Sequence, residues 1–107
     1  MALETLFLIS IISAVAVGLS VVYIIRLGIK EVIKWFRNRS AIKQADKDNI
    51  AFTLQNKLAS GKYKTVQGIF NTRNEVLVEG RVIESEEIDE EIENIHFDDD
   101  DDLVIYE

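Results

Sequence analysis

The sequence predicts a single-pass transmembrane α-helix followed by a small cytoplasmic α+β domain. Three observations support this prediction: an uncharged apolar run near the start, a basic stretch directly after it, and an acidic remainder with helix and strand patterns. The predicted parts, in order, are a short extracytoplasmic N-terminus (1–5), a transmembrane helix (6–25), a basic amphipathic juxtamembrane helix with a hinge (26–47) and a small acidic α+β interaction domain (48–107).

The transmembrane prediction depends on the run from Thr5 to Ile25, which contains no charged residue and ends at Arg26. An α-helix rises about 1.5 Å per residue, so residues 6–25 would span roughly 30 Å, the thickness of a bilayer's hydrocarbon core. Thirteen of these twenty residues are Leu, Ile, Val or Phe, and together they favour insertion by about 4 to 8 kcal/mol.

Two alternatives to a membrane span exist for this run. A buried helix of a soluble protein is disfavoured because so short a chain has little left to cover it on all sides. A cleaved signal peptide is disfavoured because the start, M-A-L-E, carries no Lys or Arg and the apolar stretch is too long.

The distribution of charge predicts the orientation of the chain. The net charge is −7, yet residues 26–47 hold seven bases and two acids, whereas residues 84–107 hold thirteen acids and no base. The positive-inside rule then places the N-terminus outside and the C-terminus in the cytoplasm. A basic helix face with an aromatic anchor suits anionic lipid head groups, although it is also typical of an ordinary stop-transfer flank. The predicted membrane-surface residues are Arg26, Lys30, Lys34, Trp35 and Arg37.

The remainder of the chain predicts an αββαβ domain with a three-stranded, mostly antiparallel sheet. Four-residue apolar spacing indicates a helix over 49–59, and Ser85 caps a second helix that runs to His96. The residues rich in β-formers predict strands over 63–70 and 76–83, a hairpin turn at N-T-R-N and a last strand at L-V-I-Y, with the 63–70 strand in the middle. Gly68 and Gly80 fall inside strands, where they would face each other, allow a bulge or admit a close helix crossing.

Two groups of residues are candidate contact sites. Small residues spaced by four let the backbones of membrane helices approach, which predicts helix packing at Ser10, Ala14 and Gly18. Exposed acids predict contacts with a basic partner at Glu86, Glu87, Glu90, Asp98 and Asp100. The run 98–102 lacks the glycine and the ligand spacing of a calcium loop, so a solvated acidic loop is the favoured interpretation.

No catalytic, nucleotide-binding or metal-binding motif occurs, and no cysteine is present. His96, the only histidine, has no sequence pattern of catalytic partners, and its ordinary role is at a helix end. We therefore expect a non-enzymatic protein without a cofactor or a nucleic-acid partner. The predicted function is that of an accessory or tethering subunit, which binds another membrane or membrane-associated protein through its cytoplasmic domain. The alternatives are a homo-oligomeric scaffold or small pore, and a membrane-bound ligand sensor.

Overall fold

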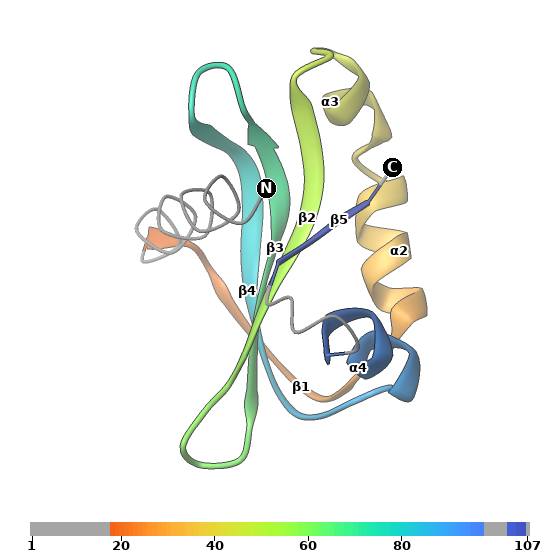
Figure 1. The fold of residues 1–107 in the computed structure, drawn as a ribbon, viewed down its shortest axis with the longest axis vertical. Helices are drawn as coiled ribbons and strands as arrows, with labels where there is room; N and C mark the ends of the chain where they lie inside the picture. Colours follow the sequence, from red (N-terminus) through yellow and green to blue (C-terminus); the bar gives the residue numbers. More distant parts are fainter. Residues whose placement is uncertain (1–17, 98–102, 107) are drawn as a thin grey trace.

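The computed structural model describes residues 18–97 and 103–106, which form one α+β fold built on a five-stranded mixed sheet. The strand order is β1-β4-β3-β2-β5, and the helices lie together on one side of the sheet (Figure 1). The elements are β1 (Val21–Leu27), α2 (Ile29–Arg37), α3 (Ser40–Gln44), β2 (Asn49–Lys57), β3 (Tyr63–Asn71), β4 (Val76–Ile88), α4 (Glu90–Phe97) and β5 (Leu103–Tyr106).

The predicted transmembrane helix is wrong. The last five residues of the predicted span, 21–25, lie in β1, which pairs in parallel with β4. Within the described ranges no helix is both long enough and apolar enough to cross a bilayer. The single-pass membrane localisation, with the N-terminus outside and the C-terminus cytoplasmic, is corrected with it. Residues 6–17 of the predicted span lie outside the described residues.

The error has a physical reason in the composition of the run. Residues 21–25 read V-V-Y-I-I, and Val, Ile and Tyr are the residues that fit best on a pleated sheet. An uninterrupted apolar stretch has no periodicity that separates a buried helix from a strand. Pairing with β4 satisfies the backbone on one side of this stretch, and the strand ends before Gly28, the N-cap of α2.

The predicted helix over 49–59 is also wrong, because these residues form β2. Ile50, Phe52 and Leu54 alternate with smaller or polar residues, and this two-residue period decides the outcome over the four-residue spacing. β2 pairs antiparallel with β3 on one side and with β5 on the other. The last strand therefore lies beside β2 and not beside the 63–70 strand, so the predicted three-stranded order is corrected as well.

The predicted hairpin and the predicted last strand are confirmed. β3 and β4 pair antiparallel on either side of residues 72–75, and L-V-I-Y forms β5. Gly68 lies directly opposite Gly80 in this ladder, and the register shifts between Ile69 and Phe70, one residue further on. β4 is longer than predicted and continues to Ile88, so α4 begins at Glu90 and not at residue 85.

The two faces of the sheet differ in chemistry. The face away from the helices carries a buried apolar cluster of Phe52, Leu54, Val66, Phe70, Val82 and Leu103. The helix-facing side carries buried polar side chains, and it meets the helices through direct hydrogen bonds. Gln67 Nε2 donates to the Val32 carbonyl of α2 at 2.8 Å, and Arg81 Nε donates to Gln67 Oε1 at 2.8 Å. A second apolar cluster, which includes Leu27, Val32, Ile83, Ile88 and Ile92, packs α2 and α4 against one end of the sheet.

The loop before β2 is tied to the turn between β3 and β4. Asp46 Oδ1 accepts a hydrogen bond from the Asp48 amide at 2.9 Å, and Asp46 Oδ2 accepts one from Arg73 at 2.7 Å and one from Asn71 at 3.1 Å. The backbone hydrogen bond from Asp48 is the main cause that holds the pKa of Asp46 below its ordinary value, with Arg73 and Asn71 acting in the same direction. These polar contacts close this end of the sheet.

Candidate functional site

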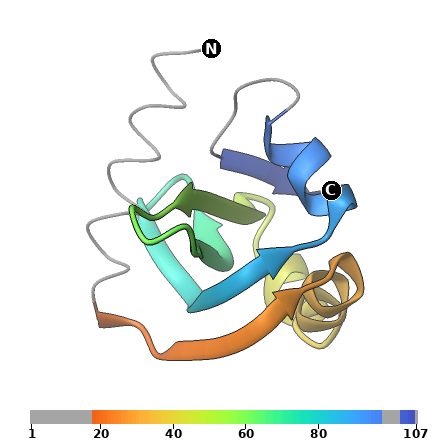
Figure 2. The same ribbon diagram turned by 90° about the horizontal axis from the view of Figure 1, so that it is seen from below.

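The outer edge of β1 is the most exposed apolar feature of the described residues. Tyr23 is 77% exposed and Ile25 is 73% exposed, and Val21 and Val22 on the same strand are also exposed. β1 is the first strand in the sheet order, so the edge turned away from β4 has no strand beside it in the described part of the chain. Figure 2 shows β1 running along the outside of the molecule beside β4. An unpaired edge with apolar side chains is a template for pairing with another strand.

The other edge of the sheet is less suited to pairing. β5 has four residues, against seven in β1, and its one exposed large apolar side chain among the described residues is Ile105, at 48%. A short edge strand presents few free backbone groups to a partner. The two edges are therefore unequal, and β5 provides a natural comparison for experiments on β1.

β1 is held in place at both ends. The Val82 amide donates to the Ser20 carbonyl at 3.0 Å, and the Asp89 amide donates to the Leu27 carbonyl at 2.9 Å. Arg26 Nε donates to Asp89 Oδ1 at 2.6 Å, and its guanidinium lies 3.6 Å from Glu87. The hydrogen bond to Asp89 is the main cause that raises the pKa of Arg26, and this contact fixes the C-terminal end of β1.

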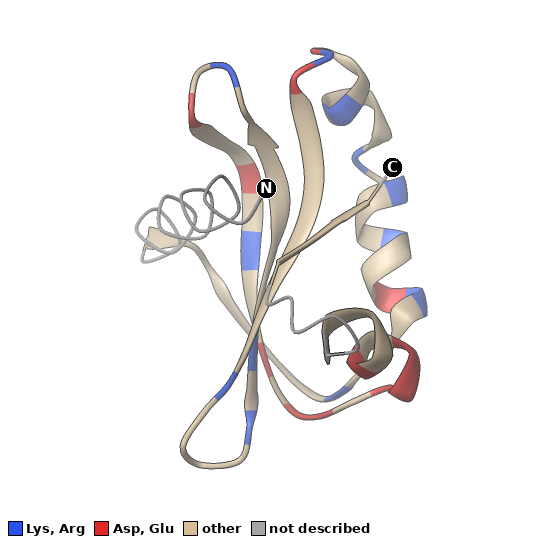
Figure 3. Ribbon diagram, viewed as in Figure 1, with Lys and Arg blue, Asp and Glu red and all other residues tan. Residues whose placement is uncertain are grey.

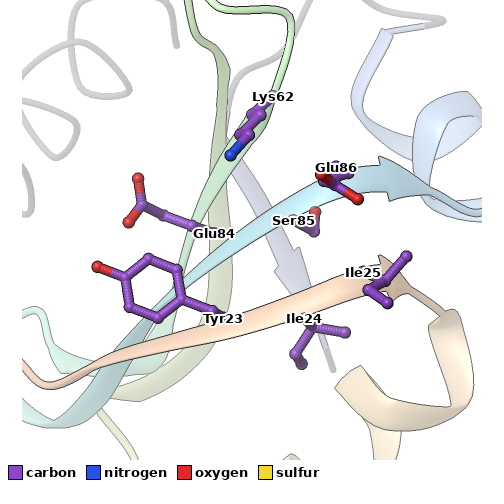
Figure 4. Close-up of a pocket in the computed structure, with 7 residues that line it drawn as sticks. All are labelled: Tyr23, Ile24, Ile25, Lys62, Glu84, Ser85 and Glu86. Atoms are coloured by element: carbon purple, nitrogen blue, oxygen red, sulfur yellow. The ribbon is translucent and has the colours of Figure 1, made fainter.

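A pocket of about 420 Å³ lies against β1, β4 and the start of β3. Tyr23 pairs with Glu84 in the ladder and Ile24 pairs with Ser85, so these side chains come from neighbouring strands. Figure 4 shows Lys62, Glu84 and Tyr23 grouped around the hollow, with Ile25 and Glu86 further along the strands. The lining residues are Tyr23, Ile24, Ile25, Lys62, Glu84, Ser85 and Glu86.

The pocket combines apolar surface with an excess of negative charge. Two carboxylates, Glu84 and Glu86, face one ammonium group, Lys62, and none of the three takes part in an ion pair within residues 18–97 and 103–106. Ser85 Oγ is buried and has no hydrogen-bond partner among the described residues. The pocket therefore offers an aromatic ring and two acidic groups beside a strand edge that no described strand covers.

Acidic residues continue from the pocket along β4 into α4. Residues 84–93 contain seven acids and no Lys or Arg, and Figure 3 shows them gathered where β4 leads into α4. Arg26 compensates two of these acids, Glu87 and Asp89. The surface next to the C-terminal half of β1 is accordingly negative, which favours cationic groups on whatever binds there.

The predicted partner-binding acids fall partly within this region. Glu86 lines the pocket, Glu87 pairs with Arg26, and Glu90 is exposed at the start of α4. Asp98 and Asp100 lie outside the described residues. The sequence therefore indicated the acidic part of the site but missed its apolar part, Tyr23 and Ile25, which the prediction assigned to a membrane helix.

The predicted membrane-surface residues do not form one helical face. Arg26 lies in β1, whereas Lys30, Lys34 and Arg37 are exposed on α2, whose hydrophobic side packs on the sheet. Trp35 is 7% exposed, so it lies in the interior and not at a surface as an anchor. The Arg39 guanidinium stacks 4.0 Å from the centre of its ring.

The predicted helix-packing residues lie mostly outside the described part of the chain. Ser10 and Ala14 lie outside the described residues, and Gly18 is exposed just before β1. The contacts with anionic lipid head groups remain a prediction that no observation tests.

A second hollow, of about 500 Å³, lies between α2, α3, β2 and β5. Ile33, Phe36, Ala51 and Tyr106 supply its apolar surface, and Arg37 and Lys43 stand at its polar side. Among the described residues, none of its lining side chains is a buried polar group without a partner.

The lone histidine belongs to a buried polar layer. His96 is 1% exposed, and its Nε2 is hydrogen-bonded to Thr53 Oγ1 at 2.8 Å. Thr53 Oγ1 is also hydrogen-bonded to Tyr106 Oη at 2.7 Å, and burial is the main cause that raises the pKa of Tyr106. In the same layer, burial lowers the pKa of Arg81. Thr53 therefore links β2 to His96 of α4 and to Tyr106 of β5.

Neither a metal-binding cluster nor a known relative adds to the description of the site in the described part of the chain. In the part of the chain that the structure describes, no group of three or more His, Asp or Glu side chains is arranged to hold a metal ion. No protein-family model, no curated protein and no solved structure matches this chain. The candidate site therefore rests on its geometry alone.

Proposed function

We propose that this chain is a non-enzymatic protein-interaction module, an accessory subunit that binds an extended segment of its partner by strand addition to β1. The observation that carries the proposal is the edge of β1, which has no strand beside it among the described residues, with its two most exposed side chains, Tyr23 and Ile25. Strand addition uses the free backbone groups of an edge strand for affinity and the alternating side chains for specificity. Both requirements are met along β1.

The arrangement of β1 supports a stable platform for such a partner. Its other side is paired with β4, and its ends are fixed by backbone hydrogen bonds and by the contact between Arg26 and Asp89. A strand that is already ordered loses little conformational entropy on binding, so more of the interaction energy appears as affinity. The pocket beside Tyr23 adds a place for a side chain of the incoming strand.

The test is a binding assay with an edge variant. A library of displayed peptides is selected against the purified full chain, and the enriched peptides are measured by fluorescence anisotropy. Ile25→Lys places a charge among apolar contacts, so we expect it to raise the Kd of these peptides about ten-fold or more. Because Ile25 is largely exposed, this variant is expected to keep the fold, which circular dichroism checks.

The matched control is Ile105→Lys on the opposite edge strand. We expect this variant to leave the Kd within about two-fold of the wild-type value, because surface substitutions away from an interface have small effects. Selected peptides that bind Ile25→Lys as tightly as the wild type would contradict the proposal. Equal losses for the two variants would contradict it too, since they would show a general effect of charge.

A further inference from the structure

We propose that the strand that β1 accepts is an extended segment in which basic residues alternate with apolar ones, and that its Lys or Arg side chains bind Glu84 and Glu86 across Tyr23. This inference rests on the proposed function, and it adds the chemistry of the partner. It uses observations that strand pairing alone does not need: the acids of the pocket, the exposed ring and the charge of the neighbouring surface.

The geometry places the acids where a basic side chain from the added strand would end. Tyr23 is paired with Glu84, so both side chains stand on the same face of the sheet, one strand apart. Neighbouring strands are about 4.8 Å apart, and an added strand would lie about 10 Å from β4. The stem of a Lys or Arg on the added strand lies across Tyr23, with its charged end toward Glu84. The basic side chain and the glutamate side chain together are long enough to span this separation.

Tyr23 itself favours a cation. Its ring is the most exposed of the large apolar side chains in the described residues, and it forms the wall of the pocket next to Glu84. A cation over an aromatic face is attracted by the ring, with a gain of affinity that grows as water is removed. An acidic or purely apolar segment would obtain neither this contact nor the ion pairs.

The negative charge around β1 disfavours a second copy of this chain as the partner. The chain carries a net charge of −7, and the surface beside β1 belongs to its acidic part. Like charges placed across an interface disfavour the wrong partner, so a second copy of this chain pairing edge to edge meets repulsion. Lys62 is the one base at the pocket, and it competes with an incoming cation for the two carboxylates.

The experiment uses three synthetic peptides with capped ends, in which valine alternates with lysine, with glutamate or with serine. Each is titrated into the full chain, and its Kd is measured at low and at physiological salt. We expect the lysine peptide to bind at least about ten-fold more tightly than the other two, and we expect its Kd to rise with salt.

Substitutions of the pocket's charged residues test whether the lysine peptide binds at the pocket. The double variant Glu84→Gln and Glu86→Gln should raise the Kd of the lysine peptide about five- to ten-fold, and Lys62→Met should lower it about three-fold. The control is Glu75→Gln, an exposed acid at the opposite end of the β3–β4 hairpin, which should change nothing. An unchanged Kd in both pocket variants would overturn the inference.

The outcomes separate this inference from the proposed function. If all three peptides bind equally and Ile25→Lys weakens all of them, strand addition stands and the basic partner is wrong. If no peptide binds and the chain sediments as a dimer that Ile25→Lys dissociates, the partner is a second copy, and the basic partner is again wrong. If nothing binds or associates through β1, both proposals fall.

Discussion

Replacing Phe52 with alanine is expected to lower the free energy of unfolding by about 3–5 kcal/mol. Phe52 is fully buried in the middle of β2, where it packs in the apolar cluster with Leu54, Phe70 and Val82. The substitution removes the transfer free energy of the ring and leaves a cavity that its neighbours, fixed in the strands, fill only in part. Since small domains are stable by about 5–15 kcal/mol, this is a large share of the total.

Chemical denaturation measures this effect directly. The chain has one tryptophan, Trp35, which is buried against Arg39, so its fluorescence reports unfolding without a label. The matched control is Ile105→Ala, because Ile105 pairs with Phe52 in the ladder but is about half exposed. We expect it to cost less than about 1 kcal/mol. A loss for Phe52→Ala no larger than that of the control would contradict the described core.

Gly68→Ala is expected to have the second large effect, about 3 kcal/mol of lost stability. A Cβ at Gly68 would lie 2.6 Å from the Glu79 carbonyl oxygen and 3.2 Å from Gly80 Cα. Both are backbone atoms of β4, paired in the ladder with β3, so relief requires a displacement of the strand and not a rotation of a side chain. Two opposed glycines here allow β3 and β4 to approach before the register shift.

Gly80→Ala is the comparison that makes this prediction specific. A Cβ at Gly80 would meet its nearest atom, the Gln67 carbonyl oxygen, at 3.1 Å, and small shifts relieve such contacts. We expect a loss of about 1 kcal/mol for Gly80→Ala, measured by the same denaturation assay. Equal losses at the two positions would show that the close approach at Gly68 is absent in solution.

The hairpin was predictable from the sequence because its signals are local. The β-formers of β3 and β4 flank a polar four-residue turn, and alternation along 76–83 marks one apolar face. β2 was not predictable in the same way, since Ile50, Leu54 and Leu58 fit a helical period and Ile50, Phe52 and Leu54 fit a strand. The long-range pairing of β2 with both β3 and β5 decides between them.

The candidate site shows the same division between local and long-range information. The acids Glu86 and Glu90 were predicted as contact residues, since a run of charges implies exposure. Tyr23 and Ile25 were missed because an apolar run has no feature that separates a membrane helix from an edge strand. Only the parallel pairing of β1 with β4, more than fifty residues away, brings these apolar side chains beside Glu84 and Glu86.

Amide hydrogen exchange of β1 tests the central claim most directly. The Ser20 carbonyl is bonded to β4, and because residues of a parallel strand alternate in direction, the amides of Val21 and Tyr23 turn to the free edge. The account predicts that these amides exchange quickly in the free chain and become at least about ten-fold slower with saturating lysine peptide, while those of β5 do not change. Protection on β5 or on α2 instead of β1 would contradict the account.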